Sequence, residues 1–144
     1  MIDATRDFLL QILRRPERVK RRILAVDSKI VESRAEMLPG GLSYNDDRVQ
    51  GFQASDKLEK YADAVLYLWS ERKKLVAEYE DAVGEVMKLT ERLPDRQRRA
   101  LRMRHLQGKS NGEIAEEMGA SKRWVQKLCK EAYENLAKTF NQTA

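Results

Sequence analysis

The stretch SNGEIAEEMGASKRWVQK, residues 110–127, decides the expected fold because it carries three helix signals in a characteristic order. Ser110, with Glu113 three residues later, forms a capping-box pattern, which predicts the start of a helix. Gly119 permits a tight turn at the end of this helix, and Ser121 is placed to cap the next one. These spacings predict two helices joined by a short turn, the helix-turn-helix arrangement.

Helix signals continue on both sides of this stretch. Upstream, Pro94 ends one helix and starts another, because the residue before a proline resists helical geometry. The new helix is expected to run to Gly108, a natural C-cap. Downstream, the helix capped by Ser121 is expected to continue to residue 136 and to bury one apolar side, formed by Val125, Leu128, Cys129, Ala132 and Leu136. Residues 93–144 are therefore predicted to form a trihelical helix-turn-helix domain.

The polar face of the last helix is the candidate binding site. With 100° per residue and the core side at Val125, the opposite face carries arginine, lysine and glutamine. Ser121 and Lys122 stand at the end that normally enters the major groove, where arginine and lysine donate to guanine and glutamine pairs with adenine. Lys109 and Asn111 are placed to hold phosphates. The predicted DNA contacts are Lys109, Ser110, Asn111, Ser121, Lys122, Arg123, Gln126, Lys127 and Lys130.

The net charge of +5 is concentrated in the same part of the chain. Residues 94–144 contain eleven lysines or arginines and six acids, whereas residues 1–93 contain seventeen of each. A local basic field of this kind favours a phosphate backbone as partner, which here means double-stranded DNA. An acidic protein surface is the alternative, in which the cations form the solvated face of a protein-docking module.

Residues 1–92 are predicted to form a helical hairpin. A short amphipathic helix over residues 3–13 is expected to be interrupted by Pro16, which suits the first turn of a second helix over residues 17–38. A polar loop containing glycine is then predicted over residues 39–54, and the sequence leaves its role open.

Ser55 is placed as the N-cap of a long helix over residues 56–91. This helix shows an unbroken three-four spacing, carried by Leu58, Tyr61, Val65, Leu68, Arg72, Leu75, Tyr79, Ala82, Val86, Leu89 and Leu93. A helix of this length needs a partner along its stripe, and residues 17–38 supply one for part of it. The hairpin is therefore either a scaffold or a homodimer interface. Gly84 lies off the stripe, at a bend or at a close approach of another backbone. The chain as a whole is predicted to be all-α.

The pattern contains no signature of catalysis, and neither an enzyme activity nor a cofactor nor a metal is expected. We find no phosphate-binding glycine loop, serine elbow or metal-ligand spacing. His105 and Cys129 are expected to pack in the core, and Trp69 and Trp124 to pack in the core or at an interface. The lone cysteine suits a reducing compartment, and no segment predicts a signal peptide or a membrane span. We therefore expect a cytoplasmic protein that does not bind a membrane.

The stretch LPDRQRRALRMRHLQGKSNGEIAEEMGASKRWVQKLCKEAYENL, residues 93–136, resembles region four of bacterial sigma factors. The shared pattern includes L-P-x-R-x-R followed by G-x-S-x-x-E-I-A. The resemblance implies promoter contacts by Ser121, Lys122, Arg123, Gln126 and Lys127, together with a contact to RNA polymerase. Trp124 departs from the pattern, in which threonine is common. Nothing in the chain resembles the promoter-melting region two, and the layout is similar to small phage and prophage proteins that end in a sigma-like unit.

Three functions remain to be distinguished. The first is a sequence-specific DNA-binding regulator of transcription, encoded by a phage or prophage and active in the bacterial host cell. The second is a DNA-packaging recognition subunit similar to small terminases, which also join a helix-turn-helix to a helical oligomerisation element. The third is an adaptor that docks on RNA polymerase without binding DNA. The sequence leaves open the target site, the sign of regulation and the oligomeric state.

Overall fold

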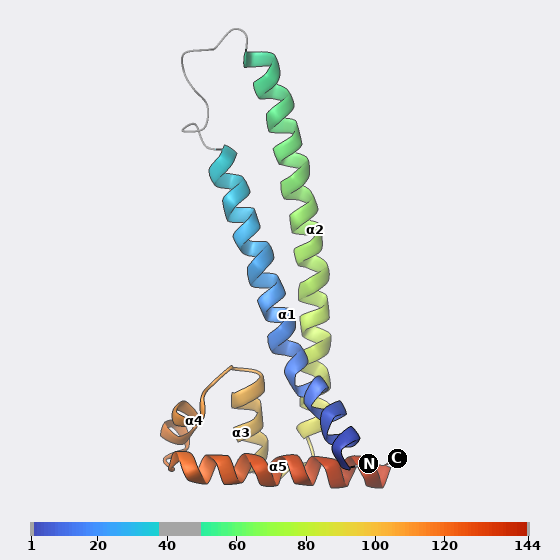
Figure 1. Cartoon of the computed structure of the whole chain (residues 1–144), viewed down its shortest axis with the longest axis vertical. Coiled ribbons are helices and arrows are strands. Elements are labelled where there is room, and N and C mark those ends of the chain that lie inside the picture. Colours follow the sequence, from blue (N-terminus) through green and yellow to red (C-terminus); the bar gives the residue numbers. More distant parts are fainter. Residues whose placement is uncertain (1, 38–49, 144) are drawn as a thin grey trace. The chain divides into compact units, whose positions relative to one another are not determined.

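Figure 1 shows the computed structural model, which describes residues 2–37 and 50–143. Within these residues the secondary structure is entirely helical, which confirms the all-α prediction. The helices are α1 (Ile2–Met37), α2 (Gln50–Thr90), α3 (Asp95–His105), α4 (Asn111–Met118) and α5 (Lys122–Thr143).

The chain divides into two compact units. The first, which we call the HTH unit, consists of Met1–Val19 and Glu78–Ala144. The second, the hairpin unit, consists of Lys20–Ala77. Helices α1 and α2 each pass through both units, so packing divides the chain at points within helices. The sequence pattern changes between residues 92 and 93, and the domain boundary predicted at that point stays a prediction.

The HTH unit has one continuous apolar core. Helices α3 and α4 pack on one side of α5, and the predicted apolar side of α5 is buried in full (Figure 1). Met103 joins the core although the sequence pattern did not indicate it. The buried members of the core are Leu9, Leu13, Val86, Leu93, Ala100, Leu101, Met103, Ile114, Ala115, Val125, Leu128, Cys129, Ala132 and Leu136.

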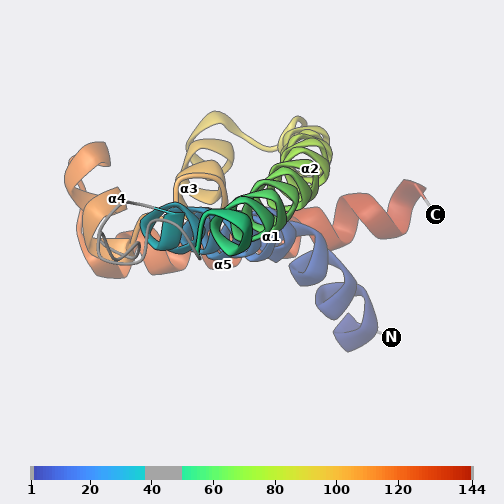
Figure 2. The same cartoon turned by 90° about the horizontal axis from the view of Figure 1, so that it is seen from above.

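The first turns of α1 contribute to this core. Leu9 and Leu13 are buried in it, and Leu13 is completely inaccessible to solvent. The ring centroids of Phe8 and Phe140 lie 5.5 Å apart, so this segment of α1 contacts the C-terminal turns of α5 (Figure 2). The sequence predicted a helix here without indicating what it packs against. In the structure the segment adds a further layer to the trihelical unit.

The predicted interruption at Pro16 is wrong, because α1 continues through this residue. A proline inside a helix removes one backbone hydrogen bond and disturbs the preceding turn. Burial offsets that loss, because the Pro16 ring is fully buried. Tertiary packing therefore stabilises a helix that the local sequence disfavours.

The junction between α2 and α3 is held by arginines of α3. Thr90 is fully buried at the C-terminus of α2, and its Oγ1 donates to the carbonyl of Val86 at 2.8 Å. Arg102 donates to Thr90 Oγ1 at 3.0 Å and to the carbonyl of Met87 at 3.2 Å. A guanidinium group at this position satisfies terminal carbonyls and complements the negative end of the helix dipole. The predicted break before Pro94 is confirmed, since α2 ends at Thr90.

The hairpin unit buries much less apolar surface. Among its described side chains, Ile30 and Leu75 are the buried hydrophobic ones. Arg72 occupies an apolar stripe position because it forms an ion pair with Asp27 of α1 at 2.6 Å. Among the described residues of this unit, six large hydrophobic side chains are exposed, namely Leu24, Val31, Leu58, Leu66, Tyr67 and Trp69.

The predicted start of the long helix at Ser55 is also wrong, since α2 begins at Gln50. Ser55 lies inside the helix, where a capping role is not possible. Residues 50–54 of the predicted loop are therefore helical, and the rest of that loop lies outside the described residues. Gly51 and Ser55 favour a helix boundary locally, but α2 continues through both of them.

Replacing Gly84 by alanine is expected to stabilise the protein by about 0.5–1 kcal/mol, because alanine has the higher helix propensity. Gly84 lies within α2, and no described atom outside its own helical surroundings comes within 4 Å of a Cβ built there. The close backbone approach considered from the sequence is therefore not found among the described residues. Urea unfolding of both proteins measures the difference, and a loss of stability in Gly84→Ala would contradict it.

Candidate nucleic-acid interface

Local capping interactions fix the two helices that carry the candidate site. The Ser110 side chain accepts a hydrogen bond from the Glu113 backbone N–H, and the Glu113 carboxylate accepts one from the Ser110 backbone N–H, which completes the predicted capping box. Gly119 has φ of 65°, in the left-handed region where glycine is favoured, and ends α4 as predicted. The backbone N–H of Trp124 donates to Ser121 Oγ at 3.1 Å, so Ser121 caps α5. The starts of α4 and α5 thus follow from signals readable in the sequence.

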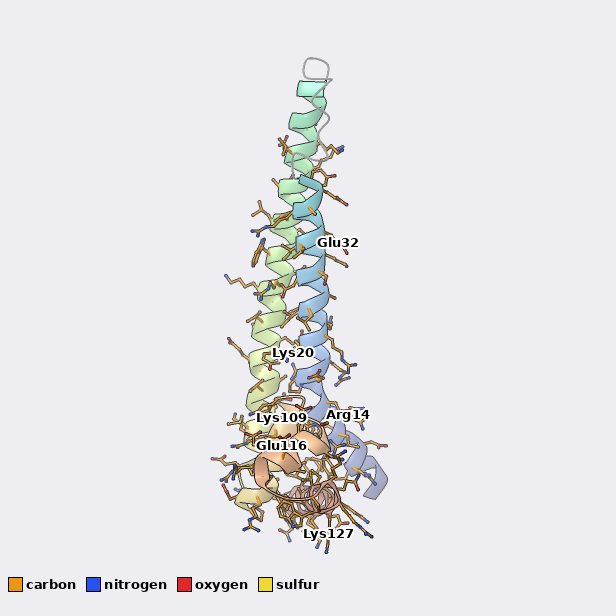
Figure 3. The ribbon with its side chains drawn as sticks, turned by 90° about the vertical axis from the view of Figure 1, so that its left-hand side faces the viewer. Arg14, Lys20, Glu32, Lys109, Glu116 and Lys127 are labelled. Atoms are coloured by element: carbon orange, nitrogen blue, oxygen red, sulfur yellow. The ribbon has the colours of Figure 1, made fainter. Side chains whose placement is uncertain are left out.

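The outer face of α5 carries the predicted cations in an exposed position. Arg123, Gln126, Lys127 and Lys130 are all exposed, and none of them is ion-paired or hydrogen-bonded to another described residue. Figure 3 shows Lys127 at the edge of the HTH unit, on the side of α5 turned away from α3 and α4. Together with Ser121, these side chains form a basic surface that is free to approach an anionic partner.

The predicted contacts at the start of α4 are already engaged within the protein. Lys109 forms an ion pair with Glu117, and Asn111 accepts a hydrogen bond from Arg104 Nη1 at 3.1 Å. A Cβ built on Gly112 would lie 3.0 Å from Cε of Lys122, so the Lys122 side chain lies across the first turn of α4. The structure therefore divides the predicted site into a free group on the outer face of α5 and an engaged group around the start of α4.

Two arginines that the sequence reasoning missed lie beside the start of α5. Arg96 and Arg99 of α3 are exposed and line a hollow together with Ser121 and Trp124. The available signal was the run of five arginines between residues 96 and 104. Sequence alone does not separate those that stabilise the fold from those that face solvent. The structure does, because Arg102 caps α2 whereas Arg96 and Arg99 extend the basic surface.

The single histidine is partly buried and packs against Tyr133 of α5. His105 Nε2 lies 2.8 Å from the hydroxyl oxygen of Tyr133, and the two rings meet edge to face. The pKa of His105 is lowered from 6.5 to about 4, mainly by burial and in addition by the positive charges of Arg104 and Arg14. The packing predicted for His105 is confirmed. Burial also raises the pKa of the Cys129 thiol, which is buried in the core as predicted.

No cluster of three or more histidine, cysteine or acidic side chains with the arrangement of a metal site occurs among the described residues. In the same part of the chain, no helix combines the length and apolar character needed to cross a bilayer. The outer face of α5 is thus the candidate site that the geometry supports.

Helices α3, α4 and α5 define a helix-turn-helix unit of the kind whose last helix is presented to a partner. Residues 84–136 match the family model described as Sigma-70, region 4. No curated protein and no solved structure matches the chain. The family match confirms the resemblance predicted for residues 93–136 and begins nine residues earlier, inside α2. The structure explains this earlier start, because Val86 and Thr90 are buried where the last turns of α2 meet α3.

Proposed function

We propose that the protein is a sequence-specific DNA-binding regulator of transcription that reads the major groove with the first turns of α5. The observation that carries the proposal is the outer face of α5, where Arg123, Lys127 and Lys130 are exposed and free of acidic partners among the described residues. The match to Sigma-70, region 4 supports the same function and adds RNA polymerase as a second partner. We further propose a phage or prophage origin, action in the cytoplasm of a bacterial host, and no catalytic activity.

The contact is expected to be confined to the beginning of α5. Glu131 and Glu134 are exposed further along the helix and would repel a phosphate backbone. Arg96 and Arg99 lie at the other end, beside Ser121, and are suited to phosphates that flank the groove. Base contacts are therefore assigned to α5, and positioning contacts to α3 and the start of α4.

Replacing Arg123 by alanine is expected to weaken binding to the preferred duplex by about 1–3 kcal/mol and to relax the base preference at one position, as loss of a bidentate base contact does. The preferred duplex is obtained by selection from a random pool, and affinity is measured at fixed salt because phosphate contacts depend on ionic strength. Lys138→Ala is the matched control, since it removes the same charge from an exposed position near the far end of α5. Equal affinities for Arg123→Ala and the unchanged protein would remove Arg123 from the reading surface.

A homodimer through the hairpin unit is part of the proposal. Two helices alone leave much of their surface in water, and here six large hydrophobic side chains are exposed while Ile30 and Leu75 are the buried ones described. Packing of two hairpins into a four-helix arrangement would cover such a surface. A dimer would also present two reading helices to the two halves of a symmetric site.

Mass in solution separates this proposal from the packaging alternative. Light scattering on the purified protein is expected to give a dimer, whereas a ring of many subunits would favour a small-terminase-like role. The polymerase-docking adaptor is separated by DNA binding itself. Failure to retain any duplex at low salt would favour the adaptor, because non-specific binding by a basic surface is strongest under that condition.

A further inference from the structure

Trp124 is an aromatic side chain within a surface that is otherwise polar and charged. It is the third residue of α5 and lies one residue after the exposed Arg123. Its indole is only partly buried, in contrast to the neighbouring Val125, which is fully buried in the core. Packing on the core therefore covers only part of the Trp124 side chain and leaves the rest accessible.

The accessible part of the indole lies on the basic surface of α5. Trp124 lines the hollow on the outer face of α5, together with Ser121, Arg123, Gln126, Lys127 and Lys130. It also lines the second hollow, which contains Arg96 and Arg99. Ser121 and Trp124 are common to both hollows, so Trp124 borders both parts of the basic surface. The hydrogen bond from its backbone N–H to Ser121 Oγ fixes the start of the helix from which the ring projects.

The geometry points to Trp124 as a specificity-determining residue that contacts the 5-methyl group of a thymine in the major groove. This inference rests on the proposed function of α5. Bases within a duplex are stacked, so a helix in the major groove meets their edges and not their faces. Among the groups on those edges, the thymine methyl is the apolar one, and the others are hydrogen-bond donors or acceptors. A partly exposed indole at this position is therefore suited to a thymine and leaves the hydrogen bonds to Arg123 and Gln126.

The test removes the methyl group from the DNA and leaves the protein unchanged. In the duplex selected from a random pool, each thymine is replaced in turn by uracil, which keeps every hydrogen-bonding group and lacks only the methyl. Affinity is expected to fall about three- to tenfold at one or two positions, as the loss of one buried methyl contact implies. If no uracil substitution changes the affinity, the contact does not exist and the inference is overturned.

A variant then assigns the methyl contact to Trp124. Trp124→Ala is expected to bind the thymine and uracil duplexes equally, whereas Lys138→Ala is expected to keep the full ratio between them. Because the indole partly packs on the core, Trp124→Phe is tested as well, and helix content is checked by circular dichroism. The smaller ring of phenylalanine is expected to retain part of the ratio. An unchanged ratio in a folded Trp124→Ala protein would assign the methyl contact to another residue and overturn the inference.

The same experiments separate this inference from the proposed function. If selection yields no preferred duplex, sequence-specific binding fails and the role of Trp124 fails with it. If a preferred duplex is found and Arg123→Ala weakens its binding while uracil has no effect, the proposed function stands and the inference about Trp124 is wrong.

Discussion

Truncating Leu13 to alanine is expected to destabilise the HTH unit by about 2–5 kcal/mol, the cost of removing a large side chain from a packed core. Leu13 is completely buried, and it belongs to the same cluster as Leu101 and Val125. Although it precedes the matched family segment by more than seventy residues, its side chain fills the core of that segment. The effect should therefore appear in the stability of the helix-turn-helix and not only in the helicity of α1.

A fluorescent reporter makes this measurement specific to the HTH unit. The chain has two tryptophans, and Trp69→Phe leaves Trp124 as the single one, inside the HTH unit. Urea unfolding followed by Trp124 emission then reports the stability of that unit. Leu24→Ala is the matched control, because Leu24 lies on the same helix, is 54% exposed and belongs to the hairpin unit. A Leu13→Ala protein whose midpoint equals that of Leu24→Ala would show that the first turns of α1 do not complete the core.

Acid is expected to destabilise the HTH unit through His105. The pKa of this side chain is lowered from 6.5 to about 4 in the folded protein, mainly by burial, so folding favours the neutral imidazole. The stabilisation linked to the neutral form is fully present above pH 6.5 and is lost as the pH falls toward 4. From this shift the loss is about 2 kcal/mol at pH 5 and about 3 kcal/mol at pH 4.

The comparison that isolates this contribution uses His105→Phe, which keeps an aromatic ring against Tyr133 and does not titrate. At pH 7 the variant is expected to lose about 1 kcal/mol, because the hydroxyl of Tyr133 loses its partner 2.8 Å away. Between pH 7 and pH 5 the unchanged protein should lose about 2 kcal/mol more stability than the variant. Parallel pH profiles for the two proteins would show that His105 titrates normally in the folded state.

The local signals of the helix-turn-helix could be predicted from the sequence because each depends on a few neighbouring residues. The capping box of Ser110 and Glu113, the left-handed Gly119 and the cap by Ser121 are all interactions across five residues or fewer. The spacing of the apolar residues in α5 predicted which side of the helix is buried. The opposite side was therefore predicted to be exposed. The candidate reading surface could thus be located without coordinates.

The predictions that failed are those in which distant packing decides the outcome. Pro16 and Ser55 are ordinary helix boundary signals, yet both lie inside helices. For Pro16 the structure gives the reason, since the ring is fully buried within the HTH unit. The role of Arg96 and Arg99 was missed for a related reason, because their neighbours Ser121 and Trp124 are more than twenty residues away in the sequence.

The joining of residues 1–19 with residues 78–144 in one core has a consequence for how the protein is made. Leu9 and Leu13 leave the ribosome long before Leu136, which belongs to the same core. At typical rates of synthesis the delay is about 6–25 s, far longer than the time a helix needs to form. During that interval the apolar face that carries Leu9 and Leu13 has no native partner. We therefore expect chaperone binding or transient self-association to compete with folding at this stage.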